Sequence, residues 1–184
     1  KLSTTMSLLS SGTSNSDRTS LFINSDDTVR FFSSESDAVA KLIKSNAVLR
    51  DPSAWYHLVL RYDSTQSTNT DRIRFYLNGS EMTYQSSPTY PAQNNSSIYI
   101  GSDDTHGVGC LFYGSTATEF FDGYMAETHY IDGTSYDHTQ FGEFNDNGVW
   151  IPKKYTGGYG TNGFYLEFKQ TGTSANSSGI GADT

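Results

Sequence analysis

Three carboxylates, Glu119, Asp122 and Glu127, are the strongest candidates for acid–base chemistry in the sequence. Hydrolysis of a glycosidic bond normally needs two carboxyl groups about 5–5.5 Å apart, or about 6.5–9.5 Å apart in inverting enzymes. Residues 119–131 are expected to form one long strand, on which Glu119 and Glu127 would lie about 26 Å apart. Asp122 and Glu127 differ in parity and would point to opposite faces of that strand. The spacing therefore builds no catalytic pair.

The remaining reactive side chains form no recognisable catalytic motif. The four histidines are scattered along the chain and lack the His-Glu-x-x-His spacing of a zinc protease, and no Gly-x-Ser-x-Gly motif marks a nucleophilic serine. The single cysteine, Cys110, allows neither an internal disulfide nor a zinc site of paired cysteines. We therefore expect that the protein is not an enzyme.

Asp103 and Asp104 are the preferred candidates for a metal site. Calcium takes oxygen ligands from flexible loops, and this pair follows an expected strand, where both carboxylates can point outward. Paired aspartates are also common in turns, so a purely structural role for them stays open. Ca²⁺ is thus the one cofactor that the sequence puts forward.

Four aromatic residues are candidates for ligand binding, because sugars are commonly bound by an aromatic ring flanked by polar groups. Trp150, Tyr155, Tyr159 and Tyr113 lie in segments rich in glycine that are expected near an edge of the fold. The alternative for each is packing within a core or loop, which is the commoner use of aromatic side chains.

Composition narrows the classes of partner. The 184 residues carry a formal net charge of −8, which repels nucleic acid and anionic membrane surfaces. No apolar run approaches the 18 residues that a membrane-spanning helix needs, so no membrane insertion is expected. The content of 13 Tyr and 11 Phe, with 17 Gly and 4 Pro, favours many short strands joined by polar turns.

Alternating apolar and polar residues predict an all-β fold, a two-sheet antiparallel β-sandwich of the jelly-roll type. Leu58, Leu60 and Tyr62 are expected to face the core from one strand, and Ile73 and Phe75 from the next. Further strands are expected at residues 20–23, 28–32, 81–84, 98–101, 119–131 and 163–168.

Three local features complete this prediction. The pair Asn78-Gly79 predicts a tight hairpin turn, and Gly123 is expected to form a bulge. Residues 37–50 fit either a helix or two short strands, and residues 135–141 are expected to contain one helical turn.

Four blocks of the sequence resemble a known family. In chain order they are Asp51-Pro-Ser-Ala-Trp-Tyr-His57, Phe75-Tyr-Leu-Asn-Gly79, Tyr99-Ile-Gly101 and Phe121-Asp-Gly-Tyr-Met-Ala-Glu127. Together they are similar to the laminin-G-like or pentraxin-like branch of the concanavalin A superfamily. Two later blocks, at residues 148–153 and 159–166, resemble the version found in structural proteins of marine bacteriophages.

The resemblance implies a jelly-roll domain over residues 1–170, with its first strand upstream of Lys1. The content of Gly, Ser, Ala and Asn in residues 171–184 predicts a loop or linker there. The resemblance further implies a non-catalytic module of a virion tail fibre or appendage that recognises a cell-surface glycan, within a larger homo-oligomeric assembly outside the cell. A purely structural role, with other virion proteins as partners, is the first alternative, and a polysaccharide-cleaving glycosidase is the second. No ligand residue is implied by the resemblance alone.

Overall fold

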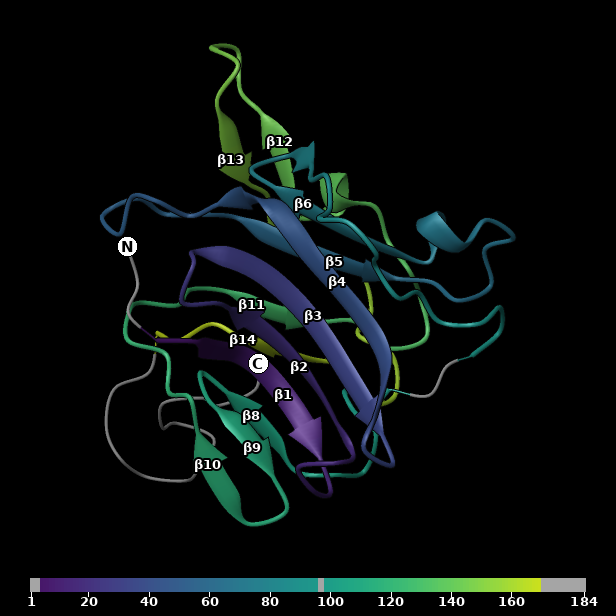
Figure 1. Ribbon diagram of the computed structural model, residues 1–184. Helices are drawn as coiled ribbons and strands as arrows, with labels where there is room; N and C mark the ends of the chain where they lie inside the picture. The colour runs from purple at the N-terminus through teal and green to yellow at the C-terminus, as the bar shows by residue number, and fades with distance from the viewer. Residues whose placement is uncertain (1–3, 96–97, 170–184) are drawn as a thin grey trace. The chain divides into compact units, whose positions relative to one another are not determined.

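The computed structural model describes residues 4–95 and 98–169 of the chain, and its largest sheet has five antiparallel strands (Figure 1). The strand order is β4-β3-β2-β1-β8. Neighbours β1 to β4 are also consecutive in the chain, so short turns suffice to connect them. The bounds are β1 Met6–Gly12, β2 Arg18–Ile23, β3 Thr28–Glu35, β4 Ala38–Val48 and β8 His106–Val108.

A second sheet contains β5 Leu58–Tyr62, β6 Ile73–Leu77 and β7 Ser80–Glu81. Asn78 (φ 47°) and Gly79 (φ 77°) connect β6 to β7 with positive φ values, as the sequence predicted. A short 3-10 helix, η1 Asn69–Asp71, lies in the loop between β5 and β6.

The core is formed where these two sheets meet. Val29, Phe31 and Ile43 from the five-stranded sheet cluster with Ile73 and Phe75 of β6, and all five are at most 1% exposed. Leu58, Leu60 and Tyr62 of β5 pack against this cluster, which confirms the predicted core faces of β5 and β6. Burial of these apolar side chains holds the two sheets face to face.

Two hairpins and a helical turn complete the first compact unit, which consists of residues 1–121 and 136–155. One hairpin contains β9 Leu111–Tyr113 and β10 Thr116–Thr118, and the other contains β12 Gly142–Phe144 and β13 Trp150–Pro152. The 3-10 helix η2 His138–Gln140 precedes β12 and confirms the helical turn expected at residues 135–141.

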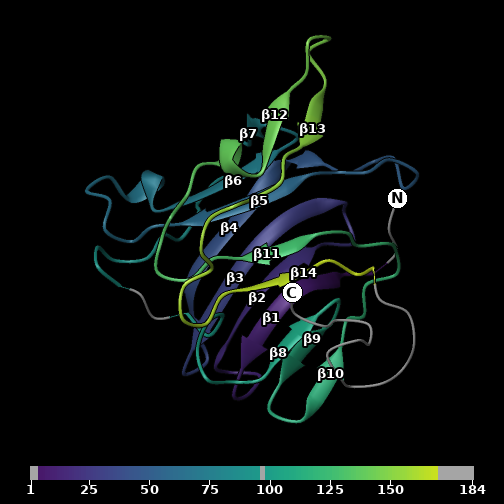
Figure 2. The same ribbon diagram turned by 180° about the vertical axis from the view of Figure 1, so that it is seen from behind.

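A second compact unit consists of residues 122–135 and 156–184, of which the part up to residue 169 is described. In it, β11 Thr128–Tyr130 pairs antiparallel with β14 Phe164–Leu166, seen from behind in Figure 2. The Tyr130 and Phe164 rings lie 5.7 Å apart across this pair. The linker predicted at residues 171–184 lies outside the described residues.

Several element predictions were wrong. Residues 119–131 do not form one strand, because Glu119 (φ 47°) and Glu127 (φ 50°) adopt left-handed conformations that interrupt an extended chain. Gly123 consequently lies in an irregular segment and forms no bulge. Residues 98–101 lie in a turn instead of a strand, and Ser102 N donates a hydrogen bond of 3.1 Å to Tyr99 O.

The ambiguous segment at residues 37–50 is neither a helix nor two strands. It forms the single strand β4, which pairs with β3 over most of its length. The predicted fold class is confirmed, because the described chain is an antiparallel β-sandwich with two short 3-10 helices.

Candidate functional site

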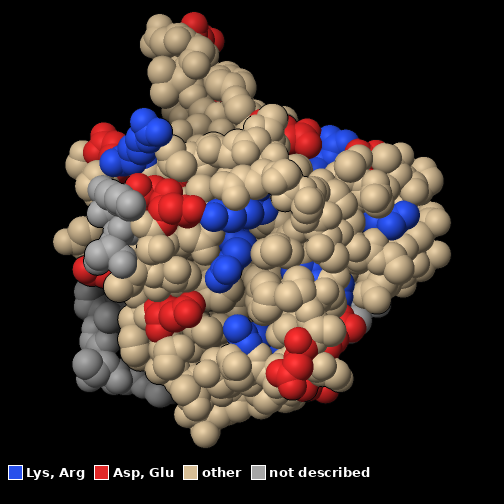
Figure 3. All heavy atoms as spheres, in the orientation of Figure 1, with Lys and Arg blue, Asp and Glu red and all other residues tan. Residues whose placement is uncertain are grey.

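The face of the five-stranded sheet opposite the core is polar and aromatic. Pairing across the strands arranges its residues in three rows. Alternation along each strand, together with the register shifts in the β1–β2 and β3–β4 pairs, puts all of them on the same side. From β4 to β1, the rows are Lys44-Arg30-Phe22-Ser7, Leu42-Phe32-Ser20-Ser10 and Val39-Ser34-Arg18-Gly12. Figure 3 shows Lys and Arg side chains crossing the strands of this sheet, with Asp and Glu near the borders.

Two arginines dominate the middle of this surface, which we call the arginine face. The Arg30 guanidinium lies 4.6 Å from the centre of the Phe22 ring and 5.7 Å from that of Phe32. The Arg18 guanidinium lies 5.2 Å from the Phe32 ring and 5.7 Å from the Tyr113 ring of β9. Such cation–π contacts fix the plane of each guanidinium and leave its edges available for hydrogen bonds.

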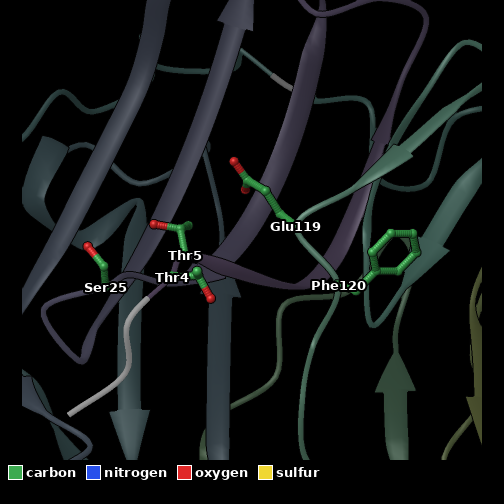
Figure 4. Close-up of a pocket in the computed structure, with 5 residues that line it drawn as sticks. All are labelled: Thr4, Thr5, Ser25, Glu119 and Phe120. Atoms are coloured by element: carbon green, nitrogen blue, oxygen red, sulfur yellow. The ribbon is translucent and has the colours of Figure 1, made fainter.

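Glu119 supplies a negative charge to the same face. It follows β10, and its backbone carbonyl accepts a hydrogen bond of 2.9 Å from Ser7 N of β1. Its left-handed φ of 47° is unusual for a residue other than glycine. Figure 4 shows its side chain lying over the strands, while the neighbouring Phe120 points away from it.

A shallow pocket of about 580 Å³ adjoins Glu119. Thr4 and Thr5 before β1, Ser25 in the turn between β2 and β3, and Phe120 complete its lining (Figure 4). Hydroxyl groups and one aromatic ring thus extend the arginine face at its border.

Several polar atoms on this face have no hydrogen-bond partner among the described residues. Unpaired buried polar groups are costly and therefore rare, unless water or a ligand satisfies them. They are Ser7 Oγ, Ser20 Oγ, Ser34 Oγ, Arg18 Nε and Arg30 Nε. All five atoms are buried and belong to residues on this one face of the sheet.

Burial shifts the ionisation of the three charged groups. It lowers the pKa of Arg30 and of Arg18, although both stay protonated at neutral pH. It raises the pKa of Glu119, and the positive charges of Arg30 and Arg18 oppose that rise. Perturbed groups that share a surface are a common property of binding and catalytic sites.

Tyr113 is the one predicted ligand residue that the structure brings to this face, through its contact with Arg18. Trp150 instead lies in β13, where its Nε1 donates to His57 Nδ1 at 3.1 Å. A Cβ atom added to Gly79 or Gly142 would come within 2.2 or 2.3 Å of the Trp150 ring. The indole is therefore packed closely between two backbone segments and offers little free ring surface.

Tyr155 and Tyr159 lie elsewhere. Tyr155 is 8% exposed and packs against the rings of Phe141, at 5.2 Å, and Tyr136, at 5.8 Å. Tyr159 belongs to the second unit, where its hydroxyl lies 2.9 Å from His129 Nδ1. The predicted aromatic residues thus do not form one site.

Asp103 and Asp104 remain a prediction as calcium ligands. Asp103 is exposed, whereas Asp104 Oδ2 accepts a hydrogen bond of 2.8 Å from Ser102 Oγ. Within residues 4–95 and 98–169, no three His, Cys, Asp or Glu side chains converge as a metal site would require. In the same part of the chain, no helix has the length and hydrophobicity to cross a membrane.

The arginine face itself was missed by sequence reasoning. Arg30 and Phe32 were assigned to one strand, and Arg18 lay just outside the expected neighbour at residues 20–23. Extending the alternation of that strand by two residues puts Arg18, Ser20 and Phe22 on one side. The hairpin register then brings them beside Arg30 and Phe32, and this was the available signal.

The described chain is an antiparallel β-sandwich, and one face of its five-stranded sheet carries arginine, serine and aromatic side chains. A family model described as the concanavalin A-like lectin/glucanases superfamily, in its laminin G form, matches residues 1–134. The chain therefore belongs to this superfamily, as its resemblance had implied. No curated protein and no solved structure gives a significant match.

Proposed function

We propose that the chain is a non-catalytic carbohydrate-recognition module that binds its ligand on the arginine face. The observation that carries this proposal is the combination of two partly exposed rings, Phe32 and Tyr113, with two guanidinium groups packed against them on one sheet face. Sugars present apolar C–H faces and many hydroxyls, so their binding sites need both kinds of contact. Membership of the superfamily supports the same class of ligand.

The test is a glycan array probed with the wild-type chain and with the variant Phe32→Ala. Phe32 contacts both guanidinium groups, so its removal should weaken binding to any array ligand by about tenfold or more. Phe144→Ala is the matched control, because Phe144 is 56% exposed on β12, far from these contacts in the sheet pairing. Equal binding by the wild type and Phe32→Ala would refute the proposed location.

Hydrolysis of a polysaccharide is a second candidate, favoured by the raised pKa of Glu119, which is a property of general acids. A second free carboxylate would be needed. Asp26 borders the same face, but its two oxygens accept hydrogen bonds from Thr28 Oγ1 at 2.5 Å and Lys44 Nζ at 2.6 Å. We therefore favour binding without cleavage. Release of reducing ends that disappears in Glu119→Gln would overturn this preference.

We further propose that the module belongs to a virion appendage outside the cell, within a homo-oligomeric assembly. This rests on the resemblance of residues 148–153 and 159–166 to phage structural proteins, and the family match ends before both blocks. In the parent particle, Phe32→Ala should reduce adsorption to the host while particle yield is unchanged. A loss of particle yield would instead support the structural alternative, in which other virion proteins are the partners.

A further inference from the structure

We propose, building on the recognition function above, that the arginine face selects acidic saccharides and that the Arg30 guanidinium binds their carboxylate or sulfate group. The ligand class follows from the charge and hydrogen-bonding state of three residues, Arg30, Arg18 and Glu119. The saccharide part of the ligand follows from the partly exposed Phe32 and Tyr113 rings beside them.

Arg30 is held in place without using its hydrogen-bond donors. Its guanidinium lies over the Phe22 ring at 4.6 Å, and Phe22 is itself 1% exposed and fixed in the sheet. Within residues 4–95 and 98–169, the side chain of Arg30 makes no hydrogen bond or ion pair, and its Nε is buried. An arginine with a fixed plane and free edges matches the two oxygens of a carboxylate or sulfate.

Arg18 adds a second positive charge on the same ring system. Its guanidinium shares the Phe32 ring with Arg30, and it donates one hydrogen bond, of 2.7 Å, to Asn15 Oδ1. Its Nε has no partner. Two partly desolvated cations that repel each other are costly to keep, and an anionic ligand would relieve that cost.

Glu119 offsets only part of this charge. Its field acts on both arginines, yet it forms no ion pair within 4.0 Å with either of them in the described chain. One carboxylate against two guanidinium groups leaves the centre of the face positive. A bound anion would compete with Glu119 for the same guanidinium groups, so removal of the Glu119 charge should strengthen anion binding.

The uncharged part of the saccharide has its own contact surface beside the two arginines. Ser20 and Ser34, with unpaired hydroxyls, flank Phe32 on β2 and β3, and the Phe32 ring is partly exposed. A simple inorganic anion would use none of these groups. An acidic saccharide would use the partly exposed Phe32 and Tyr113 rings for its sugar and Arg30 for its charge.

The experiment measures binding of four probes by isothermal titration calorimetry. The probes are a short oligogalacturonate, its neutral methyl ester, dextran sulfate and dextran. The wild type should bind at least one acidic probe about tenfold more tightly than its neutral counterpart, and the comparison shows whether carboxylate or sulfate is preferred. Arg30→Gln should abolish this preference, whereas Glu119→Gln should increase affinity for the acidic probe several-fold.

Lys154→Gln is the matched control, because it removes one positive charge from an exposed lysine that follows β13. It should leave the preference intact. If Arg30→Gln does not fold, as judged by circular dichroism, Arg30→Lys retains the charge but loses the planar donor edge, and it should lose most of the preference.

The outcomes separate this inference from the function on which it rests. Equal affinity of the wild type for acidic and neutral probes, with binding that Phe32→Ala weakens, would overturn the acidic preference and leave saccharide recognition standing. A preference that persists in Arg30→Gln or Arg30→Lys would overturn the role of Arg30. Absence of binding to all four probes would overturn the acidic preference, and a silent glycan array would then overturn the recognition function as well.

Discussion

Asp26 is the residue whose ionisation is most strongly coupled to its neighbours on the border of the arginine face. Hydrogen bonds from Lys44 Nζ and Thr28 Oγ1 lower its pKa from 3.8 to about 2. A depressed carboxyl pKa in the folded chain adds stability above the unfolded value, and this stability is lost as the pH falls from about 4 to about 2.

We predict that Asp26→Asn removes this pH dependence. Because the Asp26 side chain is 49% exposed, solvent screening reduces the effect to about 1 kcal/mol. Urea unfolding at pH 6 and at pH 2.5 should show a smaller stability difference in the variant than in the wild type. Lys44→Gln should have a similar effect, and the double variant should add little. Identical acid sensitivity of wild type and variant would contradict the coupling.

Gly142 lies directly against the Trp150 ring, which leaves no room for a side chain. A Cβ atom there would lie 2.3 Å from Cζ2 of Trp150, and the φ of this residue is not positive, so the conflict is steric. Gly142→Ala should destabilise the folded chain by about 1–3 kcal/mol in urea unfolding, because the indole has to move. Gly158→Ala, with no atom within 4 Å of the added carbon, should change stability by less than about 0.5 kcal/mol.

The hairpins β2–β3 and β5–β6 were predicted because their evidence is local, whereas β1 and the short hairpins β9–β10 and β12–β13 were missed. In β5 and β6, strict alternation identifies Leu58, Leu60, Ile73 and Phe75 as core residues, and a two-residue turn ends β6. Residues 119–131 show a similar alternation but fail as a strand. There the chain bonds to distant segments, as when Phe121 N donates to Gly109 O, and no local pattern encodes such contacts.

The same distinction explains the candidate site. Glu119 was recognised as chemically important, but it was paired with carboxylates in its own segment. Arg18 and Arg30, whose charges act on Glu119, are about 90–100 residues away in the chain. They come near it only because β8 pairs with β1 and Ser7 N of β1 donates to Glu119 O. Register between β2 and β3 is a local property, whereas the return of the chain to β1 is not.

At the scale of elements, the contact between the two sheets should dominate stability. Phe75 of β6 is 0% exposed, and its ring lies 6.1 Å from that of Tyr84 within the core cluster. Phe75→Ala should cost about 3–5 kcal/mol in urea unfolding. Val39→Ala on β4 is the control, because Val39 is 51% exposed and its truncation should cost less than about 0.5 kcal/mol. Comparable losses in both variants would contradict the sandwich core.

The whole molecule combines a formal net charge of −8 with a locally positive face. From the net charge, the sequence predicted that the chain repels nucleic acid and anionic membrane surfaces. Net charge describes the field only at a distance and does not show the positive face. An approaching ligand responds to the net charge of the molecule at long distance and to the positive arginine face at short distance. The balance between them depends on the screening length, which is about 30 Å at 0.01 M salt and about 10 Å at 0.1 M salt.

This balance predicts an unusual salt dependence for a short acidic saccharide. At about 0.01 M NaCl the ligand is repelled by the acidic molecule as a whole, whereas at about 0.1 M it responds mainly to Arg18 and Arg30 nearby. The association rate in stopped-flow measurements should therefore rise with salt over this interval, and that of its neutral ester should not change. In Glu119→Gln the rise should be smaller, because the repulsion nearest the site is gone. A rate that falls steadily with salt would mean that the arginine face, and not the net charge, governs the field at long range.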